Sequence, residues 1–238
     1  MAKKQIKSKE RVADRGEVFT NEREVKAMCD LVGQECDRID SKFLEPACGD
    51  GNFLAEILTR KLARVKQLYG KSPFDYERYS LLAVMSIYGV DIMQDNVIEC
   101  RARMFEIWDK EYQKNCKKLC NNETRESVIY VLEKNILCGN ALTLVQVDKH
   151  QNDTNEPIIF PEWSMIMGGK FKRRDFRLDV LLKEYGDENS YQQFTLDFDG
   201  DSADSSKYWE RDPITNVIIP LPVKEYEAMH YKKLKEAE

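Results

Sequence analysis

Apolar positions recur with a helical period through much of the first half of this chain, and short apolar runs separate the helical stretches. The spacing predicts helices over residues 21–36, 52–70, 75–85, 94–118 and 124–133. The short apolar segments at 43–44, 87–92, 136–138 and 157–160 are typical of strands. Strands that alternate with helices indicate an open, mostly parallel, twisted sheet with helices on both faces, so we expect an α/β fold.

The pattern weakens after about residue 185. Residues 186–206 are polar and acidic, which predicts a flexible linker. Residues 207–238 are typical of an extended segment followed by a short helix, and residues 1–15 of a charged, mobile arm. We therefore expect one domain over residues 16–185, flanked by this arm, the linker and the C-terminal segment.

Composition narrows the class of protein. The net charge of −5 and the pI near 5.4 argue against a surface that binds nucleic acid on all sides, although cations cluster at residues 3–11 and 170–177. The chain has no long apolar run and its N-terminus does not resemble a signal peptide, so we expect a cytoplasmic protein with no membrane partner. Seven cysteines and only two histidines, His150 and His230, predict free thiols and no metal site.

The most informative stretch is Phe-Leu-Glu-Pro-Ala-Cys-Gly-Asp-Gly-Asn-Phe-Leu at residues 43–54. An apolar segment ends at Glu45, a turn with Gly49 and Gly51 follows, and a helix begins at about Asn52. Glycine permits positive φ and leaves room where a Cβ would clash, so backbone can approach a nucleotide-like ligand at a helix N-terminus. The sequence therefore predicts a nucleotide site at this turn.

Polar residues at the strand ends suit the parts of such a ligand, because ligands of parallel sheets lie beyond the carboxyl ends of the strands. Asp91 can accept from ribose hydroxyls, Asn140 from an adenine amine, and Glu45 from an ammonium group. Alternatively, Asp91 and Asn140 are ordinary turn residues. A dinucleotide site fits less well, because Leu54 replaces the third glycine and Asp91 lies about 40 positions past the turn instead of about 20.

Together with Arg-Gly-Glu-Val-Phe-Thr at 15–20, these motifs resemble those of DNA adenine-N6 methyltransferases, both the γ-ordered amino-methyltransferases and type I modification subunits. The resemblance implies a Rossmann-like fold that binds S-adenosylmethionine (SAM), with Thr20 at the methionine end. The family usually has Asp where this chain has Asn140. The implied cofactor-binding residues are Thr20, Glu45, Pro46, Ala47, Gly49, Gly51, Asn52, Phe53, Asp91, Ile92, Asn140 and Ala141.

The chain departs from the family at the catalytic motif, which is Asn/Asp-Pro-Pro-aromatic after the fourth strand. Phe160, Pro161, Glu162 and Trp163 stand there instead. In the family, the amide and a proline carbonyl accept protons of the adenine amine while the aromatic stacks on the flipped base. By this alignment Trp163 could stack, a backbone carbonyl could accept, and Glu162 could replace the amide only if it points inward. We expect this loop to be the catalytic one, with weakened activity.

Lys170, Lys172, Arg173, Arg174 and Arg177 interleave with aromatic residues, which suits contact with DNA phosphates and bases. The alternative is a solvated start of a helix.

The family's target-recognition region has no counterpart here, so we expect a partner such as a specificity or restriction subunit. The leading hypothesis is a SAM-dependent DNA adenine methyltransferase of a restriction–modification or phage-defence system. The alternatives are a non-catalytic SAM-binding or DNA-binding subunit, or a methyltransferase with a non-DNA substrate.

Overall fold

The computed structural model describes residues 7–15, 17–182, 208–214 and 217–236. The predicted linker, 186–206, lies outside these residues. The helices are α1 (Lys9–Arg15), α2 (Glu22–Leu31), α3 (Gly33–Asp37), α4 (Asn52–Tyr69), α5 (Pro73–Met85), α6 (Gln94–Cys116), α7 (Asn122–Asn135) and α8 (Leu178–Leu181), with 3₁₀ turns η1 (Lys117–Leu119), η2 (Met167–Gly169) and η5 (Tyr231–Glu236). The strands are β1 (Phe43–Glu45), β2 (Ile87–Asp91), β3 (Ile136–Asn140), β4 (Val145–Val147), β5 (Asp153–Pro157), β6 (Ile159–Ile166), β7 (Lys170–Arg177), β8 (Trp209–Arg211), β9 (Ile218–Pro220), β10 (Lys224–Glu225) and β11 (Met229–His230).

The predicted helices and the first three strands are confirmed to within a few residues, except that residues 21–36 form two helices, α2 and α3. Side-chain caps define three of these helix starts. Asn21, Ser72 and Asn121 each accept a backbone N–H of the following helix turn. The α/β class is therefore correct.

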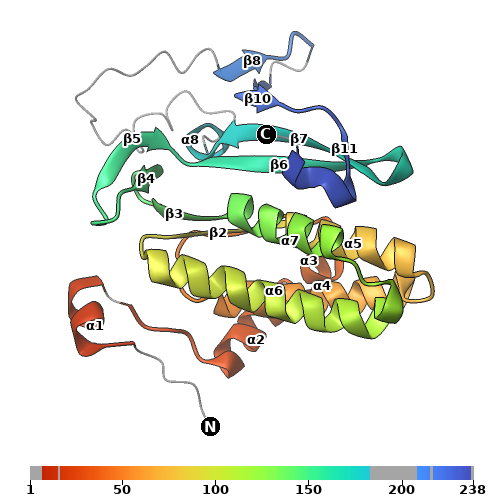
Figure 1. Cartoon of the computed structure of the whole chain (residues 1–238). Helices are drawn as coiled ribbons and strands as arrows, with labels where there is room; N and C mark the ends of the chain where they lie inside the picture. The colour runs from red at the N-terminus through yellow and green to blue at the C-terminus, as the bar shows by residue number, and fades with distance from the viewer. Residues whose placement is uncertain (1–6, 16, 183–207, 215–216, 237–238) are drawn as a thin grey trace.

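The first sheet is mixed and not mostly parallel (Figure 1). Its strand order is β1-β2-β3-β4-β5, with β1, β2 and β3 parallel and β4 and β5 antiparallel to their neighbours. The direction changes because a tight turn follows β3 in place of a crossover helix. Leu144 N–H donates to Asn140 O at 2.8 Å, and Leu144 adopts φ of +60°. The prediction of a mostly parallel sheet was wrong at this turn.

In the described part of the chain, the long helices α4 and α6 lie on one face of the parallel strands, and strands β6 and β7 of the second sheet lie on the other (Figure 1). On that second face, Tyr88 and Val90 of β2 pack with Ile158, Phe160 and Leu178. The Tyr88 and Phe160 rings meet edge to face with centroids 5.2 Å apart. The predicted helices on both faces are thus replaced by a β-hairpin on one face.

The C-terminal segment completes the second sheet. Strands β10 and β11 pair with the same strand β7, which also pairs with β6. The terminal helix, predicted over residues 225–235, is therefore wrong up to residue 230, because two short strands occupy this part and only η5 is helical. Tyr231 of η5 is buried and its hydroxyl donates to Glu77 Oε2 at 2.5 Å, which joins the C-terminus to α5. The expected boundary at residue 206 consequently does not separate two packing units.

A buried ammonium group fixes the segment that leads into β1. Lys61 Nζ donates to the carbonyls of Arg38, Ile39 and Ser41 at 2.9, 3.1 and 2.6 Å, and to Ser86 Oγ at 2.9 Å. Burial lowers the pKa of Lys61 to about 8, so the amine keeps its charge at neutral pH. The contacts hold the start of β1 against the residue that precedes β2.

Candidate functional site at the carboxyl edge of the parallel strands

The turn between β1 and α4 has the conformation that its glycines predicted. Gly49 has φ of +53° and Gly51 of +84°. The turn stays attached to the sheet, because Cys48 N–H donates to Val90 O at 2.9 Å. A Cβ on Gly51 would lie 2.6 Å from Cys100 Sγ of α6, so only glycine fits there. Sequence and packing thus agree on a strand, a tight turn and a helix N-terminus.

Asp91 ties this turn to the end of β2. Its Oδ2 accepts Gly49 N–H at 2.9 Å, while Oδ1 accepts Met93 N–H at 2.8 Å and Asn96 Nδ2 at 3.1 Å. Burial raises the pKa of Asp91, and these hydrogen bonds oppose the rise. A carboxylate has about four acceptor positions, and three of those on Asp91 are used by these hydrogen bonds. Acceptance from both ribose hydroxyls, as expected from the sequence, would need two acceptor positions, whereas these contacts leave one.

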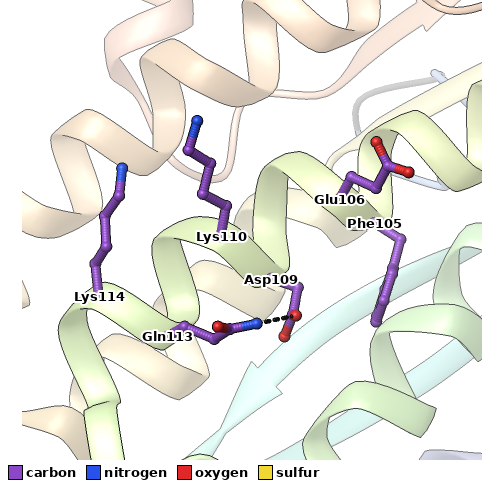
Figure 2. Close-up of a pocket in the computed structure, with 6 residues that line it drawn as sticks. All are labelled: Phe105, Glu106, Asp109, Lys110, Gln113 and Lys114. Carbon is purple, nitrogen blue, oxygen red and sulfur yellow. Dashed lines mark hydrogen bonds between the residues drawn. The ribbon is translucent and has the colours of Figure 1, made fainter.

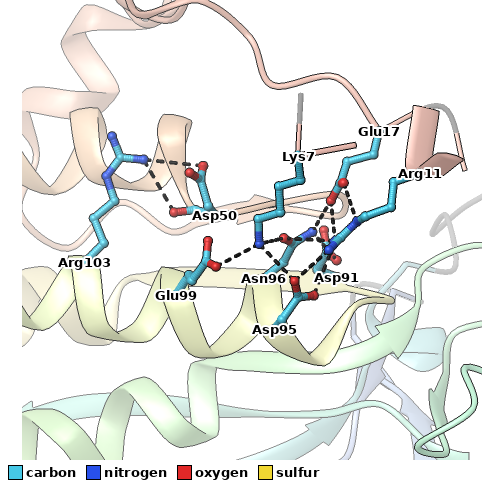
Figure 3. Close-up of polar contacts among 9 residues, drawn as sticks. All are labelled: Lys7, Arg11, Glu17, Asp50, Asp91, Asp95, Asn96, Glu99 and Arg103. Atoms are coloured by element: carbon cyan, nitrogen blue, oxygen red, sulfur yellow. Dashed lines mark hydrogen bonds and ion pairs between the residues drawn. The ribbon is translucent and has the colours of Figure 1, made fainter. Parts of the chain in front are cut away.

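The N-terminal arm is docked on the acidic side of this edge (Figure 3). Arg11 pairs with Glu17 and with Asp95 of α6, each at 2.6 Å. Lys7 lies 3.0 Å from Asp95, and its Nζ donates to Asn96 Oδ1 at 2.8 Å. The arm predicted to be mobile is therefore held by ion pairs over residues 7–15, with α1 at its centre.

The segment that precedes α2 also reaches the turn. Asn52 Nδ2 donates to Thr20 O at 3.3 Å, and Arg103 Nη1 donates to Asn52 Oδ1 at 2.6 Å. The ring of Phe19 lies 3.0 Å from the position a Cβ would take on Gly49. The structure thus brings together Thr20 and Asn52, two of the residues that the resemblance implies for the cofactor site. Arg103 was missed because a lone cation on the helical pattern of α6 carries no distinguishing signal.

Glu45 presents the second carboxylate of the site. It is half-buried at the end of β1, and its Oε1 accepts Ala47 N–H at 3.3 Å. Burial raises the pKa of Glu45. Pro46 and Ala47 are exposed in the turn, and Phe53 packs on the core as the second residue of α4. This geometry leaves Glu45 able to accept from a cationic group of a ligand.

Beyond β3, the predicted adenine contacts serve the turn itself. Asn140 Nδ2 donates to Asp153 Oδ1 at 2.9 Å, and Asn140 Oδ1 accepts Leu142 N–H at 3.0 Å. Ala141 lies in the same turn, and the Ile92 carbonyl accepts from the Cys138 thiol at 3.6 Å. The interpretation of Asn140 as a turn residue, kept open on the sequence, accounts for its contacts.

The predicted catalytic loop is not a loop. Phe160, Pro161, Glu162 and Trp163 lie inside β6, opposite residues 173–176 of β7. Trp163 is 7% exposed and its Nε1 donates to Asn135 Oδ1 at 3.0 Å, so it is a core residue and cannot stack on a base. The Pro161 carbonyl is occupied by the Tyr88 hydroxyl at 2.8 Å.

The Glu162 carboxylate also has partners within the chain. It pairs with Lys42 at 2.6 Å and with Arg174. Burial opposes ionisation of Glu162, but its two cationic neighbours hold the pKa below the ordinary value. A carboxylate held in two ion pairs is a poor substitute for a free proton acceptor. Residues 160–163 therefore do not form the expected loop, and the groups expected to act on adenine already have partners within the chain.

The cationic side chains predicted to contact DNA lie on β7, where successive side chains face opposite sides of the sheet. Arg173 is 7% exposed and pairs with buried Asp175 at 2.6 Å, so its predicted contact with DNA is wrong. Lys172 pairs with Glu225 at 2.7 Å and Arg177 with Asp179 at 2.7 Å. Lys170, Lys172 and Arg174 lie on the outward face, where their role in binding nucleic acid stays a prediction.

A separate open depression of about 530 Å³ lies along α6. Its lining residues, drawn in Figure 2, are Phe105, Glu106, Asp109, Lys110, Gln113 and Lys114. Its acidic group Asp109 pairs with Arg125 at 2.7 Å and accepts Gln113 Nε2 at 2.5 Å. At about 1.5 Å per residue, Asp109 lies roughly 20 Å along the helix from Asn96. This depression is therefore not part of the candidate site.

No protein-family model, curated protein or solved structure matched the chain. Within the described ranges, no group of three or more His, Cys, Asp or Glu side chains could hold a metal ion. None of the helices in this part of the chain is long and apolar enough to cross a membrane.

Proposed function

We propose that this chain binds SAM as a subunit of a DNA adenine-N6 modification system. The single observation that supports the cofactor assignment best is the 2.9 Å hydrogen bond from Gly49 N–H to Asp91, which joins the glycine turn to the acidic end of the neighbouring parallel strand. In this Rossmann-like reading of the parallel strands, a nucleoside lies beyond their carboxyl ends.

The residues present fit the polar groups of SAM. Glu45 would accept from its ammonium group, Asp91 from a ribose hydroxyl, and the turn at Gly49 and Gly51 would lie against the ligand. Bound SAM supplies an activated methyl group. The chain's own residues bind and orient that group, and the arm at Lys7 and Arg11 covers the acidic side of the site.

The placement of residues 160–163 favours a binding subunit over a complete enzyme. A lost positioned acceptor costs about 10²–10³ in rate, by analogy with a lost oxyanion-hole donor. Since Trp163 and the Pro161 carbonyl serve the core, we infer that a partner chain, such as a specificity or restriction subunit, supplies the groups that act on adenine and select the DNA sequence.

Calorimetry with SAM tests the cofactor assignment. We expect the wild type to bind, and Asp91→Asn to weaken binding at least about tenfold, or about 1.4 kcal/mol. Asp148→Asn is the matched control, because Asp148 also accepts backbone N–H groups in a turn, at 2.8 and 2.9 Å, but lies in the β4–β5 hairpin. Absence of binding by the wild type, or equal binding by Asp91→Asn, would overturn the assignment.

Transfer of a labelled methyl group tests the subunit assignment separately. We expect no transfer to mixed-sequence DNA by the isolated chain, and transfer after addition of the products of neighbouring genes. Strong transfer by the isolated chain would show that it is a complete enzyme. Transfer to a protein or a small molecule, with none to DNA, would show that the substrate class is wrong.

A further inference from the structure

One side of β1 is unpaired in the described part of the chain. In a parallel ladder, alternate residues of a strand bond to a given neighbour. Phe43 N–H donates to Ser86 O at 2.9 Å, and Phe43 and Glu45 are in register with Ile87 and Gly89 of β2. The N–H and C=O of Leu44 therefore point away from β2, toward the side where no described strand pairs.

This edge opens into an apolar groove of about 370 Å³ between β1 and the second sheet. Its walls include Tyr88, Phe160 and Phe176. Leu44 and Ile219, which also line it, each leave 38% of their surface exposed, so apolar side chains gather there without being covered. Leu44 is the register partner of Tyr88 of β2, so the two side chains lie on the same face of the first sheet. The groove therefore extends the apolar layer between the two sheets to the edge at β1.

The charges that line the groove do not balance. Lys42 and Arg174 share a single carboxylate, Glu162, and the groove is otherwise lined by uncharged residues. The groove therefore carries one net positive charge, in a chain whose net charge is −5. An acidic residue placed near Lys42 and Arg174 would complement this charge.

We propose that this groove binds an extended segment of a partner polypeptide, which pairs with the free edge of β1 as an added strand. Main-chain hydrogen bonds to Leu44 supply affinity, and alternate apolar side chains of the segment fill the groove. An acidic residue on the segment lies beside Lys42 and Arg174. This surface is distinct from the carboxyl edge that holds the candidate SAM site, so the proposal does not depend on the proposed function.

Amide hydrogen exchange of the chain alone is the first test. We expect the Leu44 amide to exchange fast while the amides of Phe43 and Glu45, which face β2, exchange slowly. A slow Leu44 amide at low concentration would show that another part of the same chain covers the edge. Protection that appears only at high concentration, with a dimer in ultracentrifugation, would show that the occupant is a second copy. Either result would overturn the proposal.

Selection of short random peptides against the full chain is the second test. We expect the recovered peptides to alternate apolar and polar residues, to carry an acidic residue, and to slow exchange of the Leu44 amide. N-methylation of alternate backbone nitrogens gives a matched pair of peptides. Methyl groups on the edge that faces β1 should abolish binding, and methyl groups on the opposite edge should leave it unchanged.

Variants of the groove complete the test. Leu44→Lys should weaken the selected peptides at least about tenfold, whereas Ile129→Lys, at a 41% exposed position of α7, should not. Arg174→Glu should weaken acidic peptides while the circular dichroism spectrum stays unchanged. Recovery of peptides without the alternating pattern, peptides that bind without protecting Leu44, or no peptides at all would overturn the proposal.

Discussion

Asn96 is 1% exposed, and both polar atoms of its side chain have charged partners. Its Nδ2 donates to Asp91 at 3.1 Å and to Glu17 at 2.7 Å, while its Oδ1 accepts from Lys7 at 2.8 Å. Through this one amide, docking of the arm is linked to the position of Asp91. Nothing in the sequence pattern indicates this role, because asparagine side chains are mostly exposed.

Acid should release the arm. Hydrogen bonding by Arg11, reinforced by Lys7, lowers the pKa of Asp95 from 3.8 to about 2. A depressed carboxyl pKa stabilises the folded state fully above the unfolded value, and this contribution is lost as the pH falls through the folded value. We therefore expect amide exchange in residues 7–15 to accelerate between about pH 4 and pH 2, relative to the core.

The substitution Asp95→Asn should loosen the arm already at neutral pH, as measured by proteolysis at Arg11. Asp109→Asn is the control, since Asp109 forms its ion pair with Arg125 in the second half of the same helix. An arm that stays equally protected in Asp95→Asn would contradict this account of its docking.

The strand–turn–helix from β1 to α4 is the element that both the sequence pattern and the packing define. Its glycines serve two needs at once, positive φ and close approach to α6. At Gly51 both needs coincide, because φ is +84° and a Cβ would lie 2.6 Å from Cys100 Sγ. The sequence predicted the first need from glycine spacing. The second depends on α6, which begins more than 40 residues later in the chain.

Gly51→Ala should therefore destabilise the protein more than backbone strain alone, which costs about 1–3 kcal/mol. Gly168→Ala is the control, because Gly168 also has positive φ, +74°, but has open space around it. Urea unfolding should show the larger loss for Gly51→Ala, and Cys100→Ala in the same chain should restore part of it. Equal losses for the two glycine variants would refute the steric contribution of Cys100.

At the scale of the whole molecule, the second sheet covers the face of the parallel strands where helices were expected. Its β7 strand carries a buried ion pair between Arg173 and Asp175, with donor–acceptor distances of 2.6 and 2.7 Å. The Arg173 guanidinium also lies over the rings of Tyr226 and Trp163. The basic stretch of the sequence is thus partly a core feature that joins the second sheet to the C-terminal segment.

Removing one partner of this pair should cost about 3–5 kcal/mol, because it leaves a buried charge uncompensated. We expect this loss in urea unfolding for Arg173→Met, and a smaller loss for the double variant Arg173→Met with Asp175→Leu. Lys172→Met, on the outward face of the same strand, should change stability little. If Arg173→Met were as stable as the wild type, Arg173 would be a surface residue available to DNA after all.

Prediction from sequence succeeded where the signal is local. Helical spacing located α4 to α7, and the glycines located the turn that places Gly49 beside Asp91. Prediction failed where the burial of a residue depends on which distant segment packs against it. A tryptophan at position 163 looks the same in sequence whether it lies in an exposed loop or in a core strand. Its burial in β6 and its contact with Asn135 show that it is a core residue.

The sequence alone determined the helices, the first three strands and the conformation of the glycine turn, because periodicity, caps and positive φ act between residues close in the chain. Tertiary structure decided that β3 turns back into a hairpin, that Arg173 and Trp163 are buried, and that no strand of the described residues pairs with the outer edge of β1. Burial and strand pairing arise from contacts between distant segments, so no short stretch of sequence specifies them.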